Sequence, residues 1–361
     1  MTERFLESKR QPVAGYDHIV FDENEIAALR EKLDLQTPLR VHWTWDYVTE
    51  IESLRRLYER GKGMQWDVER DIDWSLELPE TENLMPLVDS PLAATLHMMG
   101  RDRETIRRCI RDELEWSISQ VLHGEQAALL LCAQLVTSVP HMDAKLFAGQ
   151  QVVDECRHVE MFAKLLARKF GTVHPISPNI KFLLDQMVSA DDWHKKTIGM
   201  QVLFEGVAMA VITDIGKRTT SELVRQAMRM VARDEARHAA FGVLTLREEL
   251  SQLGQAERDR LEEWTWMCLE VVANGLMSSL FDEIGPKYGL APKALAQGVF
   301  STREFWDYRY HLFNHTVLPN LRKLGIITEH TRRNYDTFRL LEDRAPFGTE
   351  MLPDSILFDA R

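Results

Sequence analysis

The sequence predicts an all-α protein organised around a bundle of four helices. Two observations carry this prediction. A Glu followed thirty residues later by Glu-x-x-His occurs twice, and the second copy begins eighty residues after the first. The rest of the chain is rich in helix-forming residues and lacks the alternating apolar and polar pattern of strands. Two copies of one arrangement on paired helices are typical of a four-helix bundle with one central site.

The repeated residues are Glu125, Glu155 and His158 in the first copy and Glu205, Glu235 and His238 in the second. Within each Glu-x-x-His, the two side chains lie on one face of a helix. A turn near Pro140 lies about midway between the two Glu of the first copy, and a turn near Thr219 does so in the second. Equal arms of an antiparallel hairpin return both side chains to one height, roughly 20 Å from the turn. The spacing therefore predicts one layer of four carboxylates and two imidazoles.

Apolar runs surround these carboxylates. Ala127–Leu131 follows Glu125, and Val207–Val211 follows Glu205. A carboxylate inside such a run is buried, and buried carboxylates are normally paired or bound to metal. Glu and Glu-x-x-His on facing helices hold two iron or two manganese ions in helical bundles. We therefore predict a dinuclear metal site rather than surface charges on amphipathic helices.

Residues 1–95 are expected to form an N-terminal arm with short helices. Helical patterns cover Asp22–Leu33 and Thr44–Arg60, between connections that contain proline. The segment Trp66–Trp74 mixes acidic residues with tryptophan. Two interpretations stay open for this segment, an arm that lies over the bundle or a contact between subunits.

Residues 96–254 are expected to form the bundle itself. Its four helices are predicted at Arg101–Thr137, Met142–Lys169, Asp191–Gly216 and Ser221–Leu253. Gly171 and Gly254 end the second and fourth helices, because glycine favours the conformation that closes a helix. Further helical sequence begins near Ile180, between the second and third of these helices.

Residues 255–361 are expected to add helices that pack on the bundle, so that the chain forms one globular domain overall. The predicted helices are Gln255–Ile284, Pro292–Val299 and a region from Thr302. The final twenty residues are predicted to be a loosely ordered tail or a docking strand. His311 and His315, at i and i+4, could bind a metal, but no carboxylate or cysteine stands at a suitable spacing.

Composition narrows the class of protein. The net charge of -12 disfavours nucleic-acid binding. Because no apolar run reaches eighteen residues and the first residues are too polar for a signal peptide, we expect a soluble, cytoplasmic protein without a membrane span. The four cysteines show no Cys-x-x-Cys spacing and are expected to be free core residues. Two of them could approach the metal site, because Cys132 shares a helix face with Glu125 and Cys156 is adjacent to Glu155.

The segments 124–128 (GEQAA), 154–158 (DECRH) and 234–238 (DEARH) resemble the ferritin-like di-iron carboxylate superfamily. Within it they are most similar to the oxygenase branch, which contains the p-aminobenzoate N-oxygenase-like proteins and the hydroxylase subunits of bacterial multicomponent monooxygenases. The resemblance covers the bundle that carries the motifs. Residues 319–325 add a fainter similarity to the end of the N-oxygenase-like group.

This resemblance implies a role for each repeated residue. Glu125, Glu155 and His158 would hold one iron, and Glu205, Glu235 and His238 would hold the other, with Glu155 and Glu235 as bridges. Asp154 and Asp234 would each accept the free imidazole N–H of the histidine in the opposite motif. Arg157 and Arg237 would neutralise these buried acids, the alternative being ordinary ion pairs on the helix surface.

Three positions depart from relatives in this superfamily. Phe162 stands four residues after His158, where the small subunit of a ribonucleotide reductase has its radical tyrosine, so that function is disfavoured. Met209 stands four residues after Glu205, where multicomponent monooxygenases have a threonine. Val231 stands four residues before Glu235, where the arylamine N-oxygenases have a histidine as a seventh ligand. The substrate and the oxygen chemistry therefore stay open.

The resemblance implies an enzyme that uses two Fe ions and O₂ to oxidise a small organic substrate by hydroxylation, N-oxygenation or desaturation. The residues three or four positions from a ligand are expected to form a substrate pocket or ordinary core, namely Leu129, Phe162, Ala208 and Met209. An external electron donor, a ferredoxin or a flavin reductase, is expected, and so is a homodimer. Two alternatives stay open: a dimanganese or manganese–iron oxidase or catalase-like protein, and a non-catalytic iron storage protein.

Overall fold

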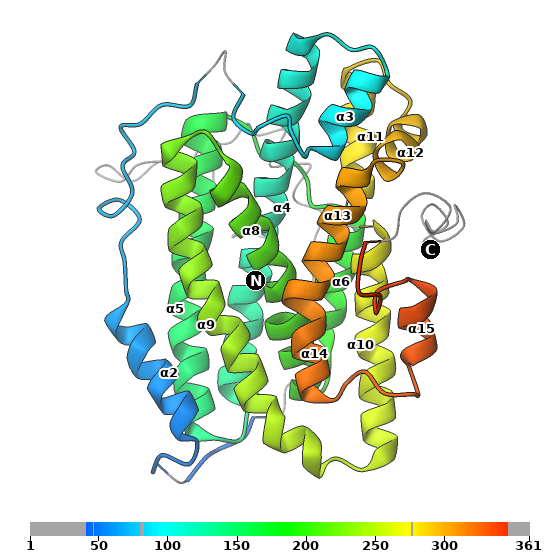
Figure 1. Ribbon diagram of the computed structural model, residues 1–361. Coiled ribbons are helices and arrows are strands. Elements are labelled where there is room, and N and C mark those ends of the chain that lie inside the picture. The colour runs from blue at the N-terminus through cyan, green and yellow to red at the C-terminus, as the bar shows by residue number, and fades with distance from the viewer. Residues whose placement is uncertain (1–40, 46, 80–82, 276, 346–361) are drawn as a thin grey trace, which may run out of the picture.

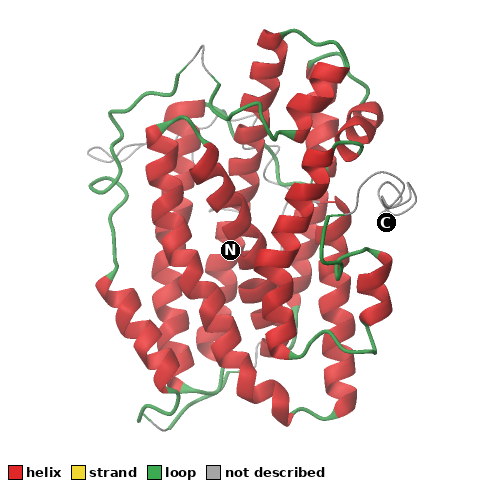
Figure 2. Cartoon of the chain, viewed as in Figure 1, coloured by secondary structure: helices red, strands yellow, loops and turns green. Residues whose placement is uncertain are grey.

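The computed structural model describes residues 41–345 apart from 46, 80–82 and 276 (Figure 1). Figure 2 shows that the regular elements of these residues are all helices, which confirms the predicted all-α class. The predicted helix Asp22–Leu33 and the predicted tail from residue 346 lie outside the described residues.

Two antiparallel hairpins form the bundle. The first consists of α4 (Arg103–Ser138) and α5 (Met142–Leu165), and the second of α8 (Glu205–Arg218) and α9 (Glu222–Gln252). The first helix of the first hairpin and the second helix of the second hairpin are capped: the side chain of Asp102 accepts a hydrogen bond from the backbone N–H of Thr105, and that of Ser221 from Val224. When the helical residues 166–170 after α5 and 193–204 before α8 are included, the four predicted bundle helices are present, with ends that differ by at most two residues from the predicted ones.

The third bundle helix contains a π-helical segment that sequence patterns do not reveal. It starts as α7 (Trp193–Thr197), widens into η3 (Ile198–Phe204) and continues as α8. A second π-helical segment, η2 (Leu166–Phe170), extends α5 to Gly171, whose φ of 75° closes the helix as predicted. Segments of this kind are rare and frequently lie at functional sites. Here η3 ends at the residue before Glu205.

The arm packs on the outside of the bundle. Its helix α2 (Glu52–Gly63) lies along α5 and α9 (Figure 1). The prediction that this helix starts at Thr44 is wrong by eight residues. The carboxylate of Asp143 on α5 accepts the backbone N–H groups of Glu50 (2.8 Å) and Ile51 (3.0 Å), so a side chain from the bundle fixes the helix start. After α2 the chain runs over the bundle to α3 (Pro91–Met98).

The remaining helices cover one side of the bundle. They are α6 (Pro178–Ser189), α10 (Gln255–Gly275), α11 (Ser278–Lys287), α12 (Pro292–Phe300), α13 (Arg303–Leu312), η4 (Phe313–Val317), α14 (Leu318–Leu324) and α15 (Arg332–Thr337). The predicted single helix Gln255–Ile284 is wrong, because it is broken between α10 and α11. The side-chain amide of Asn179 donates to the carbonyl of Gly275 (2.7 Å) and to Ser278 (3.0 Å), and a Cβ at Gly275 would lie 2.2 Å from it.

Separate apolar clusters lie on the two sides of the carboxylate layer. Val121, Phe162 and Val231 belong to a cluster that continues toward α3, α11 and α12. Leu131 and Leu203 belong to a second cluster with α10, α14 and α15. The repeated carboxylates therefore lie in the middle of the bundle, with packed side chains above and below them.

The helical stretch Trp193–Arg218 is long and apolar enough, by length and composition, to cross a membrane. Of its most apolar window, 67% is buried inside the fold. It also carries Glu205, which is buried. This stretch is the third helix of the bundle, and its apolar character follows from its burial there.

Candidate metal centre

The six repeated side chains meet in the centre of the bundle. They are all buried: Glu125 is 3% exposed, Glu205 1%, and Glu155, His158, Glu235 and His238 are 0% exposed. They form two groups whose ligand atoms lie within 4.8 Å of one another, one from Glu125, Glu155, His158 and Glu235 and one from Glu155, Glu205 and His238. The structure thus brings together all six residues that the repeat indicates.

The two imidazoles share two of the carboxylates. Nδ1 of His158 lies 3.1 Å from Glu155 and 3.0 Å from Glu235, and Nδ1 of His238 lies 3.3 Å and 3.0 Å from the same two side chains. Glu125 is 3.2 Å from His158, and Glu205 is 3.7 Å from His238. Glu155 and Glu235 therefore lie between the two halves, and Glu125 and Glu205 each lie at one end.

The other imidazole nitrogens face the aspartates of the opposite motif. Nε2 of His158 lies 3.3 Å from Asp234, and Nε2 of His238 lies 3.3 Å from Asp154. Trp66, which is 4% exposed, donates its indole N–H to Asp234 at 2.7 Å. This contact places the arm over the bundle, although the sequence left open whether that segment contacts another subunit.

The two arginines of the motifs join the aspartates. Arg237 donates to Asp234 (2.6 Å) and Asp154 (3.3 Å), and Arg157 donates to Asp154 and to Asp234 (3.4 Å). The Arg157 side chain is 11% exposed and that of Arg237 is 5% exposed. These contacts are buried and run between the two halves of the repeat, so they differ from ordinary ion pairs on a helix surface.

Electrostatics in the cluster favour positive charge. Burial raises the pKa of Glu125 and of Glu205 well above the ordinary value, and the charge of Glu235 raises both further. Burial opposes ionisation of Glu235 as well, but the charge of His238 and a hydrogen bond with Glu205 hold its pKa well below the ordinary value. Burial lowers the pKa of an imidazole, yet the carboxylates outweigh it, raising the pKa of His238 to about 10 and that of His158 well above its usual range.

A pair of divalent cations fits this donor set. Oε1 of Glu235 is buried and accepts no hydrogen bond from the described residues, although it lies 3.0 Å from Nδ1 of His158. A proton on Nε2, held by an aspartate, leaves the Nδ1 lone pair of each histidine free for a metal. Carboxylate and imidazole donors suit both iron and manganese.

A polar layer lies on one side of the carboxylates, and sequence reasoning missed it. The side-chain amide of Gln151 donates to Glu155 (2.8 Å) and Glu205 (3.2 Å), and Gln201 donates to Gln151 (3.0 Å). Gln201 also approaches the Cys132 sulfur at 3.7 Å. Both glutamines stand four residues before a repeated Glu, which is a signal that the sequence does contain.

An apolar layer lies on the opposite side. Val121 and Val231 stand four residues before Glu125 and Glu235, and both are buried, 9% and 0% exposed. Phe162, four residues after His158, is also 0% exposed. Val231 occupies the position where the arylamine N-oxygenases have a histidine, so this side of the cluster offers no further ligand at that position.

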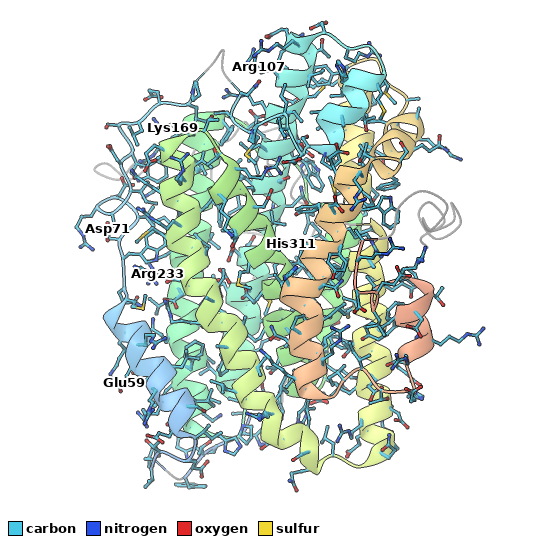
Figure 3. The ribbon with its side chains drawn as sticks, viewed as in Figure 1. Glu59, Asp71, Arg107, Lys169, Arg233 and His311 are labelled. Carbon is cyan, nitrogen blue, oxygen red and sulfur yellow. The ribbon has the colours of Figure 1, made fainter. Side chains whose placement is uncertain are left out.

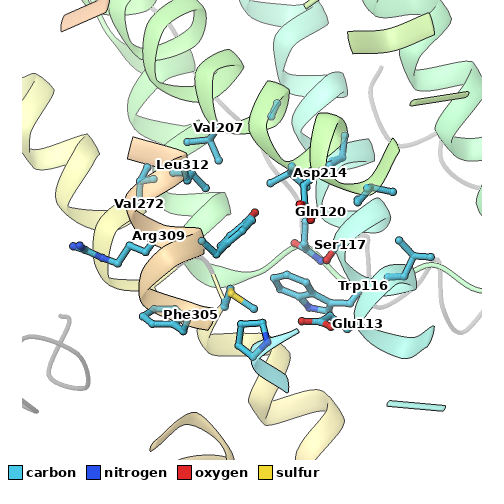
Figure 4. Close-up of a pocket in the computed structure, with 18 of the residues that line it drawn as sticks. Glu113, Trp116, Ser117, Gln120, Val207, Asp214, Val272, Phe305, Arg309 and Leu312 are labelled. Atoms are coloured by element: carbon cyan, nitrogen blue, oxygen red, sulfur yellow. The ribbon is translucent and has the colours of Figure 1, made fainter. Parts of the chain in front are cut away.

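A cavity of ≈ 250 Å³ continues from the apolar layer (Figure 4). Val121 and Ala208, each about one helical turn from a repeated Glu, line it, as does Phe204 beside Glu205. Of the four residues expected at a substrate pocket, Ala208 lines this cavity, and Leu129, Phe162 and Met209 do not. The cavity lies between α4, α8 and the helices α10 and α13.

The second histidine pair lies away from this cluster. His311 and His315 are exposed, with ring centroids 4.4 Å apart, and Figure 3 shows His311 on α13 at the front of the molecule. The described residues near them supply no third metal-binding side chain. The buried repeat is therefore the better candidate for a metal centre.

Buried Glu and Glu-x-x-His side chains on paired helices define this protein as a di-metal carboxylate bundle. The sequence matches the family model of p-aminobenzoate N-oxygenase AurF over residues 49–281, from just before α2 into α11. The chain belongs to this family of ferritin-like di-iron oxygenases, which confirms the resemblance and the enzyme class. No curated protein matches the chain.

Proposed function

We propose that this protein is a di-iron N-oxygenase that uses O₂ to oxidise the nitrogen of a small organic amine. The observation that carries the proposal is the buried donor set in a chain of the p-aminobenzoate N-oxygenase family. Glu125 and His158 would hold one iron, and Glu205 and His238 the other. Glu155 and Glu235 would bridge the two, which their contacts with both imidazoles support.

The iron pair, when bound, supplies the redox chemistry that O₂ requires. In the net reaction one oxygen atom joins the amine nitrogen and the other leaves as water. Two electrons and two protons balance this reaction, and we infer that a ferredoxin or a flavin reductase delivers the electrons.

The side chains around the donor set have three tasks. The aspartates hold each imidazole with its proton on Nε2, and the arginines keep those aspartates ionised. Burial would raise the pKa of Asp154, but its hydrogen bond with His238 and the nearby charges hold the pKa below the ordinary value. Gln151 donates to Glu155 and Glu205 and so limits their rotation. The apolar layer with Val121 and Val231 excludes water from the opposite side.

We assign the substrate to the cavity that continues from this apolar layer. It is concave and lined mostly by apolar side chains, as small-molecule sites usually are. Ala208 lines it one turn from Glu205, so Ala208→Phe would fill the end next to the donor set. We expect this variant to raise the KM for an amine at least about tenfold, which is about 1.4 kcal/mol of lost binding, while the bound iron stays unchanged.

The direct test is product analysis. The full-length protein is loaded with ferrous iron without oxygen, and then a chemical reductant, an aromatic amine and ¹⁸O₂ are added. We expect a product in which one ¹⁸O is attached to nitrogen, and no product from Glu155→Ala. Oxidation confined to carbon, or no product from iron-loaded protein across a broad set of amines, would contradict N-oxygenation.

A further inference from the structure

The cavity beside the donor set has one polar end. It is formed by Glu113 on α4, Asp214 and Arg218 on α8, and Tyr308 on α13. Figure 4 shows Glu113 and Asp214 among the lining residues. These groups are close enough that the charges of Asp214 and Glu113 both raise the pKa of the Tyr308 hydroxyl, after burial itself. These four side chains supply two acids, one base and a hydroxyl, and the exposed Asp89 also lines the cavity.

The polar end lies far from the donor set. Glu113 stands twelve residues before Glu125 and Asp214 nine residues after Glu205, distances of roughly 18 Å and 13 Å along the helices. The nearer lining residues, Val121 and Ala208, are about one turn from the donor set. A molecule that reaches from them to the polar end must therefore span roughly 9–12 Å, which is more than one aromatic ring.

The charges at this end are unequal. Asp214 and Arg218 form a salt bridge at 3.1 Å, and Arg218 also donates to the carbonyl of Val88 (3.2 Å), so these two largely neutralise one another. Glu113 has no hydrogen bond or ion pair with another described residue, and the same holds for the Tyr308 hydroxyl. Burial, with only partial relief from Arg218, raises the pKa of Glu113 to about 7.

A second arginine, Arg309, lines the cavity, but its guanidinium contacts other groups. The guanidinium of Arg309 points away from the other labelled lining residues (Figure 4) and donates to the carbonyl of Phe338 at 3.2 Å. It also lies over the rings of Trp306 and Phe313. A carboxylate at the polar end would thus meet Glu113, while the two arginines that line the cavity already contact Asp214 and the carbonyl of Phe338, and burying such a charge is costly.

We propose that the substrate carries a second basic group, an ammonium or an amidinium, at the end remote from the nitrogen that is oxidised, and that Glu113 and Tyr308 bind it. This assignment rests on the proposed function, since it takes the cavity as the substrate site. p-Aminobenzoate, which gives the family its name, has a carboxylate in the remote position. The polar end of this cavity has the opposite charge preference.

Three probes of equal length and different remote charge test the assignment. They are para-(aminobutyl)aniline, para-(hydroxybutyl)aniline and para-(carboxypropyl)aniline, whose binding to the full-length, iron-loaded protein is measured by calorimetry without O₂. We expect the ammonium probe to bind at least about tenfold more tightly than the carboxylate probe, because a charge-assisted hydrogen bond replaces a repulsion. Near pH 7 its binding should also release a proton from Glu113, which appears as a dependence of the heat on the buffer.

Glu113→Gln keeps the shape and removes the charge. We expect this variant to bind the ammonium probe about tenfold or more weakly and to release no proton on binding. Its affinity for the alcohol probe should stay within about twofold of the wild type. Tyr308→Phe is a second variant, which removes one hydroxyl and should weaken the ammonium probe and the alcohol probe alike. Glu104→Gln, on the exposed part of α4, is the matched control and should change none of these affinities.

Equal or tighter binding of the carboxylate probe would overturn the assignment, and so would an unchanged ammonium affinity in Glu113→Gln. Absence of binding by all three probes would overturn it as well, because the cavity would then not be the substrate site. These measurements use no turnover, so they are independent of the test of N-oxygenation. Failure of that test with an intact ammonium preference would contradict the reaction and not the binding site.

Discussion

Nε2 of His158 lies 3.3 Å from Oδ2 of Asp234, a residue of the other half of the repeat. His238 and Asp154 repeat the relationship at the same distance. Each hairpin therefore supplies the group that orients the histidine of its partner hairpin. Because Arg157 and Arg237 each contact both aspartates, the four side chains join the two hairpins directly outside the donor set.

Asp234→Asn should weaken metal binding by about 10- to 100-fold, because the neutral amide no longer fixes the proton on Nε2 of His158 or raises its basicity. The measurement is a competition titration of the purified protein against a chelator of known affinity. Asp307→Asn, on the exposed face of α13, is the control and should leave the affinity unchanged. Equal metal affinity in Asp234→Asn and in the wild type would contradict the proposal that Asp234 orients His158.

Gly242→Ala should destabilise the protein, because the added Cβ would lie 2.4 Å from the Cβ of Gln201, which cannot rotate away. Overpacking of this kind costs about 1–3 kcal/mol. Gly149→Ala in α5 is the matched control, because its Cβ meets nothing within 4 Å. Replacing this helical glycine should raise the free energy of unfolding by roughly 0.5–1 kcal/mol. Urea denaturation of the two variants gives both values, and a neutral Gly242→Ala would mean that α9 and η3 are less closely packed.

Trp66→Phe tests the contact of the arm with the metal centre. The change keeps an aromatic ring but removes the indole N–H that donates to Asp234 at 2.7 Å. A buried acceptor that loses one donor costs about 1–3 kcal/mol, so the free energy of unfolding should fall by that amount. Trp74→Phe, whose indole donates to the carbonyl of Val68 farther from the centre, serves for comparison. Trp74→Phe should leave the metal affinity unchanged, whereas Trp66→Phe should lower the metal affinity.

His141 makes the attachment of the arm dependent on pH. Burial lowers its pKa, but hydrogen bonds with Glu249 (2.9 Å) and Glu50 (2.7 Å) outweigh this and raise it above the ordinary value of 6.5. Because the pKa is higher in the folded state, the stabilisation is fully present below about pH 6.5 and is lost as the pH rises through the folded-state value. The difference in unfolding free energy between the wild type and His141→Gln should therefore shrink from pH 6 to pH 9. A difference that is constant across this range would show that His141 does not stabilise through its charge.

The bundle and its donor set could be predicted because the repeat encodes them locally. Spacing of i and i+3 fixes a helix face, and similar distances to Pro140 and Thr219 fix the height at which the side chains meet. The differences between the predicted and the observed helix ends come from contacts between segments that are distant in the sequence. Asn179 breaks the helix at Gly275, 96 residues away, and Asp143 sets the start of α2 from α5.

The surroundings of the donor set were less accessible to sequence reasoning. Gln151 and Gln201 stand four residues before a Glu, as Val121 and Val231 do, but on helices that run in the opposite direction. The same offset therefore places the glutamines on one side of the carboxylates and the valines on the other. Only the helix directions separate the polar side from the apolar side, and η3 changes the register before Glu205. The polar end of the cavity depends on α13, about a hundred residues farther along the chain.

Metal analysis of the full-length protein tests the central claim most directly. The protein is purified from cells supplied with both iron and manganese, and its metals are counted beside those of Glu155→Ala and His238→Ala. We predict two irons per chain in the wild type and a loss of metal in both variants, with helical content unchanged. Two manganese ions would contradict the assignment of iron but not the site. Protein without metal, with both variants as stable as the wild type, would contradict the dinuclear centre itself.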